Sequence, residues 1–284
     1  MNKIQRLFDI GIRKIERKRH SWKQYAEGCN YEVTPDQARE ELQQFWPDCK
    51  SSCYVTHRDK KENQYDLSII IPAYNVEKYL QACLNSVQKQ KTKVHYQTIV
   101  VNDGSTDKTK EILEKYESLE NWVIIHQENK GFSGARNTGI DAATGKYLMF
   151  LDSDDKLSDD AIENLMTCAM KNDAQVVAGN FVQVTTDGKI IENGGKYKNR
   201  KIEAVGNLHG QPFGKVYKRC LFDHLNFPEK YWYEDSIFAQ ILWPMTNSVY
   251  TISDCVYEYT LNPGSITQTG QFKPKAVDSL YITE

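Results

Sequence analysis

The stretch KYLMFLDSDD at positions 146–155 indicates the fold most clearly. Its apolar first part predicts a buried strand of a parallel sheet. Carboxylates as close as Asp152, Asp154 and Asp155 repel one another unless a cation lies among them, and Mg²⁺ or Mn²⁺ prefers oxygen ligands that it shares with substrate phosphates. Because ligands of open α/β sheets bind at the carboxyl ends of the strands, the stretch predicts a metal-assisted phosphate site. The alternative is an acidic turn that caps a helix starting near Asp159.

The composition is that of an ordinary globular protein with 284 residues, 40% hydrophobic residues and a net charge of −2. The length suits one large domain or two modest ones, and the net charge gives no reason to expect a nucleic-acid partner. No apolar stretch approaches the roughly 18 residues that a membrane-spanning helix needs, and the first residues lack the apolar block of a signal peptide.

Seven scattered cysteines favour a reducing, cytoplasmic location. A zinc site built from Cys29, Cys49, Cys53 and His57 is disfavoured by its irregular spacing.

Residues 1–66 form a separate first region. Within residues 1–24, Ile4, Leu7, Phe8, Ile12 and Ile15 recur at helical spacing among eight basic and two acidic residues. Such a basic amphipathic helix can lie on an anionic membrane, which predicts peripheral contact with the inner face of the plasma membrane. The alternative is a helix that packs on the protein body. The rest of this region is polar, with a helix expected over residues 35–45.

Apolar strand and helix patterns alternate from Leu67 onward. The expected strands are 67–71, 98–101, 122–125, 146–151 and one starting at Val176. The expected helices have their apolar faces within 76–87, 112–119 and 162–169, and a further helix follows Gly131–Gly134 with Gly145 as its cap. This alternation predicts βαβ units and a mostly parallel sheet over residues 67–180. A hairpin over 181–191 then opens a less regular half, 181–284, on the same sheet.

Four loops follow the predicted strands and should meet at one edge of the sheet. In the first loop Tyr74 can stack on a flat base, and in the second Asp103 can accept a hydrogen bond from a pyrimidine ring N–H. The third loop is glycine-rich, and Arg136 near a helix N-terminus suits a pyrophosphate. The fourth is the acidic run 152–155. Each loop alone is also consistent with an ordinary turn or helix cap, so the prediction depends on their combination.

These motifs resemble those of the family 2 inverting glycosyltransferases of bacterial polysaccharide and oligosaccharide synthesis. The resemblance rests on 68-SIIIPAYN-75, 101-VNDGSTD-107, the 128–139 block and 150-FLDSDD-155, and it extends over about residues 67–266. It implies an α/β GT-A fold, in which helices flank a mostly parallel central sheet and a smaller irregular half binds the acceptor. It also implies a nucleotide-diphosphate sugar donor, most often a UDP-sugar, and Mn²⁺ or Mg²⁺ as cofactor.

The resemblance also implies roles for individual residues. Tyr74 and Asp103 would hold the nucleobase, Arg136 would lie near the base or phosphate, Asp152 would contact the ribose, and Asp154 would bind the metal. The full donor-binding set expected in the 67–180 half is Pro72, Tyr74, Asp103, Arg136, Asp152, Ser153 and Asp155.

The 181–284 half supplies a candidate catalytic base. The stretch 231-YWYEDSIF-238 resembles the family's Glu-Asp motif, whose Asp, here Asp235, would take the proton of the acceptor hydroxyl. Trp232 and Tyr233 suit stacking on a sugar ring. Glu234 and Lys215 are further acceptor candidates. The alternatives are that Glu234 and Asp235 cap a helix beginning near Ser236, and that Lys215 is a surface charge.

The sequence therefore predicts a metal-dependent inverting glycosyltransferase. It would move a sugar from a nucleotide-sugar to a hydroxyl of a glycan or lipid-linked oligosaccharide. One departure from the resemblance is Thr260, which stands where many relatives carry an arginine. A nucleotidyltransferase is disfavoured because residues 72–75 form no basic, glycine-rich loop. A non-catalytic subunit that binds nucleotide-sugar for another transferase is the main alternative, and the presence of both the acidic run and Asp235 argues against it.

Overall fold

The computed structural model describes residues 56–262 and Asp278. The predicted helices over 1–24 and 35–45 and most of the proposed 1–66 region therefore lie outside the described residues. The zinc alternative stays untested for the same reason, since Cys29, Cys49 and Cys53 belong to that part of the sequence.

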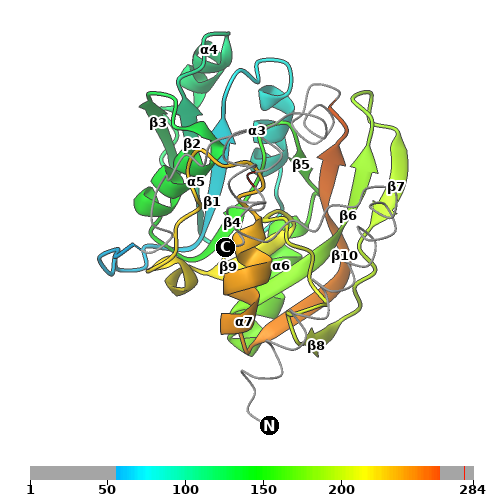
Figure 1. The fold of residues 1–284 in the computed structure, drawn as a ribbon. Helices are drawn as coiled ribbons and strands as arrows, with labels where there is room; N and C mark the ends of the chain where they lie inside the picture. Colours follow the sequence, from blue (N-terminus) through cyan, green and yellow to red (C-terminus); the bar gives the residue numbers. More distant parts are fainter. Residues whose placement is uncertain (1–55, 263–277, 279–284) are drawn as a thin grey trace, which may run out of the picture. The chain divides into compact units, whose positions relative to one another are not determined.

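The first half of the sheet consists of four parallel strands in the order β3-β2-β1-β4 (Figure 1). Their bounds are β1 Tyr65–Ala73, β2 Tyr96–Asp103, β3 Trp122–Gln127 and β4 Gly145–Phe150. Each coincides with a predicted strand. The interior positions of β1, β2 and β4 are buried on both faces, which is why these strands have continuous apolar sequences. Strand β3 lies at the end of this order, and its interior positions are only partly buried or exposed.

The sheet continues beyond β4 with strands from later in the chain. The additional strands are β5 Lys156–Leu157, β6 Val176–Val184, β7 Ile190–Gly194, β8 Arg200–Ile202, β9 Lys215–Lys218 and β10 Val249–Thr260. Strand β9 lies antiparallel between β4 and β6, and β10 is parallel to β6. The two predicted halves therefore build one sheet. The predicted hairpin is confirmed, because β7 pairs antiparallel with β6.

Helices cover both faces of this sheet (Figure 1). Their bounds are α3 Leu80–Gln88, α4 Thr109–Leu113, α5 Gly131–Ala142 and α6 Ala161–Asn172. A further helical stretch begins at Ser236 and comprises the π-helix η3 Phe238–Leu242 and α7 Trp243–Met245. Side chains alternate along β1, so Leu67, Ile69 and Ile71 pack with α3 and α6, whereas Ile70 packs with α5.

Two predicted helix details are wrong. Helix α5 begins at Gly131 itself, so the glycines of this loop belong to the helix rather than precede it. Gly145 does not cap α5 but begins β4, where a Cβ atom would overlap the backbone of Ser68 on β1. This glycine is therefore required by close packing of two strands, not by a helix end.

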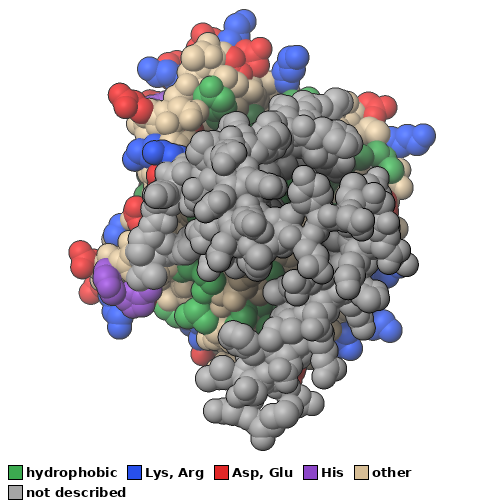
Figure 2. Space-filling view, in the orientation of Figure 1, with side chains coloured by type: hydrophobic (Ala, Val, Ile, Leu, Met, Phe, Trp, Pro, Cys, Tyr) green, Lys and Arg blue, Asp and Glu red, His purple; other side chains and the backbone are tan. Residues whose placement is uncertain are grey.

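The surface carries both signs of charge. On the face in Figure 2, lysine, arginine and acidic side chains are interspersed around the rim of the described part. Within residues 56–262, no helix is long and apolar enough to cross a lipid bilayer.

Candidate active site

The first two loops of the carboxyl edge are tied together by Asn75. This residue has a left-handed backbone with φ 51°. Its amide oxygen accepts the Thr106 backbone N–H at 2.8 Å, and its own backbone N–H donates to Ser105 Oγ at 3.0 Å. Ser105 and Thr106 are thus engaged by the neighbouring loop, and neither caps α4, whose N-cap residue is Lys108. These hydrogen bonds of Asn75 fix the position of the preceding residue, Tyr74, whose side chain is 50% exposed at the end of β1. Pro72 is buried within that strand.

Asp103 is the last residue of β2, and only one of its two carboxylate oxygens accepts hydrogen bonds from the described residues. Its Oδ1 accepts hydrogen bonds from Gln127 Nε2 at 2.6 Å and from the Lys130 backbone N–H at 2.8 Å. Its Oδ2 is buried and has no hydrogen-bond partner within the described part of the chain. Leaving a buried acceptor unpaired is costly, so this oxygen is suited to a ligand donor such as the ring N–H of a uracil.

The three carboxylates of the acidic loop have three different environments. Asp152 forms an ion pair with Arg136 at 2.7 Å. Asp155 is buried and accepts hydrogen bonds from the Tyr257 hydroxyl and from the Thr260 backbone N–H, both at 2.7 Å. Asp154 accepts a hydrogen bond from the Asn262 side-chain amide at 3.3 Å. The adjacent Ser153 is buried.

Tyr257 holds the loop together from β10. Its hydroxyl donates to Asp155 and accepts the Asp152 backbone N–H at 3.2 Å. Asp155 is therefore a structural anchor between the acidic loop and the end of β10. Its predicted place among the donor-binding residues remains a prediction.

The loop also fits the way in which Mg²⁺ and Mn²⁺ bind. Burial raises the pKa of Asp154, and the nearby Asp152 charge raises that pKa further, so a cation would relieve both effects. No group of three His, Cys, Asp or Glu side chains among the described residues could enclose a metal ion. A site with one or two protein carboxylates, completed by substrate phosphates and water, is the usual arrangement for such cations. The helix-cap alternative for this run is wrong, because α6 has Asp160 as its N-cap residue.

Arg136 links the acidic loop to the segment that carries the candidate base. Its Nη2 pairs with Asp152 and its Nη1 pairs with Glu234, 98 residues later in the chain. Burial alone would lower the pKa of Arg136, but the two carboxylates outweigh burial and raise that pKa. Burial raises the pKa of Glu234 to about 7, although Arg136 opposes this shift. Glu234 thus pairs with an arginine rather than capping the helix that begins at Ser236.

Asp235 lies beside this pair on a constrained backbone. Tyr233, two residues before it, has φ 63°, a strained value for a non-glycine residue. Burial raises the pKa of the Asp235 carboxyl, while Arg136 and then Lys215 favour its charged form. A carboxylate with a raised pKa is a better proton acceptor than an exposed one.

Lys215 is fully buried, so the alternative of a surface charge is wrong. Its Nζ lies 2.8 Å from the Gln211 carbonyl oxygen and 2.9 Å from His209 Nδ1. Burial lowers the pKa of Lys215, and burial together with Lys215 lowers the pKa of His209 to about 3. A direct acceptor contact by Lys215 remains a prediction.

The aromatic acceptor candidates precede Glu234. Tyr233 is 37% exposed, and the Trp232 backbone N–H donates to Asp278 at 2.8 Å. Their stacking on a sugar ring remains a prediction.

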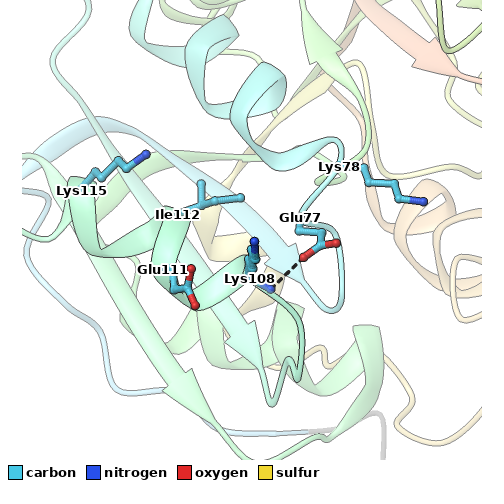
Figure 3. A pocket seen from close by; sticks show the side chains of 6 residues that line it. All are labelled: Glu77, Lys78, Lys108, Glu111, Ile112 and Lys115. Atoms are coloured by element: carbon cyan, nitrogen blue, oxygen red, sulfur yellow. Dashed lines mark hydrogen bonds between the residues drawn. The ribbon is translucent and has the colours of Figure 1, made fainter.

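A surface hollow of about 430 Å³ lies apart from the predicted site residues (Figure 3). It is lined by Glu77, Lys78, Lys108, Glu111, Ile112 and Lys115. The Lys108 backbone N–H donates to Glu77 at 3.0 Å, so part of its rim is the connection between the first two loops. None of the predicted site residues lines this hollow.

Sequence reasoning missed the supports of the site. Gln127 orients Asp103, and Tyr257, Thr260 and Asn262 hold the acidic loop. The only signal was that the aromatic run 257–259 and the polar loop after it follow the expected base in the sequence. Pairing between residues about one hundred positions apart leaves no periodic pattern in the sequence.

Comparisons with known proteins identify the family of this chain. The family model described as Glycosyl transferase family 2 matches residues 68–225. Glycosyltransferase GlyA of Streptococcus pneumoniae is 30% identical over 223 residues, which cover 71% of this chain and 31% of GlyA. Glycosyltransferase GlyG of the same organism is 31% identical over 221 residues, which cover 72% of this chain and 73% of GlyG.

A solved structure has the same fold. S. aureus TarS 1–349 in complex with UDP-GlcNAc superposes with a TM-score of 0.64 and 26% identity, over 72% of this chain and 61% of that one. This likeness confirms the expected α/β GT-A fold. The chain spans about a third of GlyA and under two thirds of the TarS fragment. Because the family model covers more than half of the sequence, and GlyG matches over most of its own length, the chain belongs to glycosyl transferase family 2.

Proposed function

We propose that this protein is a metal-dependent inverting glycosyltransferase that moves a sugar from a UDP-sugar to a hydroxyl of a glycan or lipid-linked oligosaccharide. The observation that carries the proposal is the position of Arg136 between Asp152 and Glu234. This pairing brings the acidic loop and the segment with Asp235 to one site, as a transferase needs for donor and acceptor. TarS, a relative in fold, has been crystallised with UDP-GlcNAc and with UDP, which supports a UDP-sugar donor.

Each site residue would have a separate role in the reaction. Tyr74 would stack on the nucleobase, and Asp103 Oδ2 would accept a hydrogen bond from the ring N–H of that nucleobase. Asp235 would remove the proton of the acceptor hydroxyl as that oxygen attacks C1 from the face opposite the leaving diphosphate, which inverts the anomeric configuration. A Mn²⁺ or Mg²⁺ ion held by Asp154 would stabilise negative charge on the departing diphosphate. Trp232 and Tyr233 would orient the acceptor sugar. Membrane contact through residues 1–24 remains a prediction for a part of the chain outside the described residues.

The test is a transfer assay with the full chain. The protein is incubated with a panel of UDP-sugars and oligosaccharide acceptors, with Mn²⁺ or with EDTA, and released UDP and glycosylated product are both quantified. We expect product from one donor class only, with the opposite anomeric configuration to the donor and dependence on Mn²⁺. Nucleotide binding without any UDP release would instead support a non-catalytic binding subunit.

Nucleobase recognition gives a separate prediction. In Asp103→Asn, an oxygen can still accept from Gln127 and Lys130, but an amide N–H₂ replaces the open Oδ2 and faces the uracil N–H. Losing one hydrogen bond to a charged group costs about 1.5–3 kcal/mol, so UDP affinity should fall roughly 10- to 150-fold.

Calorimetric titration with UDP and CDP measures this change. Cytosine has a ring acceptor where uracil has the N–H, so CDP should lose less affinity than UDP or gain some. An equal loss for both nucleotides would contradict direct base recognition by Asp103.

A further inference from the structure

Two consecutive residues of α5 hold the segment that carries the candidate base. The Asn137 side chain donates to the Phe227 carbonyl oxygen at 2.9 Å and accepts the Phe227 backbone N–H at 2.8 Å. Arg136 pairs with Glu234 at the other end of the same segment. All four residues are buried. The segment from Phe227 to Glu234 is thus fixed at both ends to one helix, and Asp235 follows directly.

The surroundings of Arg136 argue against the donor contact expected from the sequence. Its guanidinium lies 5.4 Å from the Phe227 ring centroid and 5.8 Å from that of Phe132. Only 7% of its side chain is exposed, and it is already paired with two carboxylates. Glu234 and Asp152 engage Nη1 and Nη2, so neither of these terminal nitrogens is left to bond a diphosphate. The Nε atom is buried and has no hydrogen-bond partner among the described residues.

We propose that Arg136 is a positioning residue that holds Glu234, and with it the adjacent Asp235, at a fixed place relative to the donor-side Asp152. The inference rests on the proposed transferase function. The planar fork of an arginine can serve two carboxylates at a set angle, whereas a lysine is a single point charge. Arg136 therefore connects the donor side and the acceptor side of one reaction centre.

The test separates turnover from donor binding. Displacing a reacting group by about 1 Å can cost about 100-fold in rate. We therefore expect Arg136→Met to lower kcat about 100-fold or more, while the donor KM and the Kd for UDP stay within about threefold. Arg136→Lys should recover only part of the loss. Arg219→Met is the matched control, because Arg219 bonds the Gly145 carbonyl oxygen away from this site. A raised donor KM with unchanged kcat would show that Arg136 contacts the donor and would overturn the proposal.

A second set of variants keeps the test decisive if Arg136→Met folds poorly. Glu234→Gln retains an oxygen for Arg136 and should lose much less turnover than Glu234→Ala. Because both residues act through one contact, Arg136→Met combined with Glu234→Ala should be no slower than the slower single variant. Multiplied losses would show independent roles and would contradict the proposal.

Hydrogen exchange distinguishes a failed proposal from a failed function. Arg136→Met should exchange faster over residues 227–237 and remain unchanged in β1–β4, whether or not a sugar is transferred. Unchanged exchange over 227–237 would overturn the positioning role. Absence of transfer by the unmodified protein with every donor would instead overturn the proposed function.

Discussion

Asp235→Asn should lower kcat about 10³-fold or more while leaving UDP affinity within about threefold. General base catalysis contributes about 10²–10⁴-fold, and asparagine keeps the shape of the side chain but cannot take a proton. A 10³-fold loss corresponds to about 4 kcal/mol of transition-state stabilisation. Single-turnover rates with saturating donor and acceptor measure the effect directly, and calorimetry with UDP measures the binding.

Two controls separate this role from general damage to the protein. Asp254→Asn replaces an aspartate on β10 outside the site and should have near-normal turnover. Hydrolysis of the donor by water should fall less than transfer in Asp235→Asn, if water attacks without the acceptor-side base. Turnover of Asp235→Asn within tenfold of the unmodified protein would place the base elsewhere.

The pH profile should report the same carboxylate. Asp235 works as a base only when it is deprotonated, so kcat/KM should fall as the pH is lowered through its pKa. Burial raises that pKa above the ordinary 3.8, so the acid limb should lie higher than for an exposed aspartate. This limb should disappear in Asp235→Asn. The same shift means that protonated Asp235 favours the folded state at low pH, and this contribution is lost as the pH rises through the folded-state pKa.

The sheet could be predicted because buried parallel strands leave a local signal. Strands β1 to β4 have continuous apolar runs, and their order along the chain places the following loops at one edge. Asp103, Tyr74 and the acidic run were found in this way. The position of Gly145 was not, because its requirement comes from the backbone of β1 and not from its own neighbours in sequence.

The long-range partners that give similar residues different environments could not be predicted. Asp154 and Asp155 are adjacent in sequence, yet only Asp155 is bonded by both Tyr257 and Thr260, more than one hundred residues away. Arg136 has the charge and the sequence position expected of a phosphate ligand, but its guanidinium forms an ion pair with the distant Glu234. Partners far away in sequence determine which charged groups already have a hydrogen bond or an ion pair. A local sequence pattern contains no information about these partners.

This difference among the three aspartates makes Asp154→Ala the sharpest test of the metal. Arg136 compensates Asp152, and two hydrogen bonds satisfy Asp155, so Asp154 is the carboxylate best placed to bind a cation. In the unmodified protein, UDP at one hundred times its Kd should stabilise the fold by about 2.7 kcal/mol in the presence of Mn²⁺. Asp154→Ala should lose most of this gain, and its transfer rate should fall about 10³-fold.

Asp155→Asn is the matched control, because it changes a neighbouring carboxylate by one atom. It disturbs the bonds to Tyr257 and Thr260, so it should lower the melting temperature of the unliganded protein while the Mn²⁺-dependent gain with UDP persists. Asp154→Ala should show the reverse, since Asp154 accepts a long hydrogen bond, from Asn262 at 3.3 Å, whereas Asp155 accepts two at 2.7 Å. An equal Mn²⁺-dependent gain in both variants would mean that the cation is held by other groups, and transfer that persists in EDTA would mean that the reaction proceeds without it.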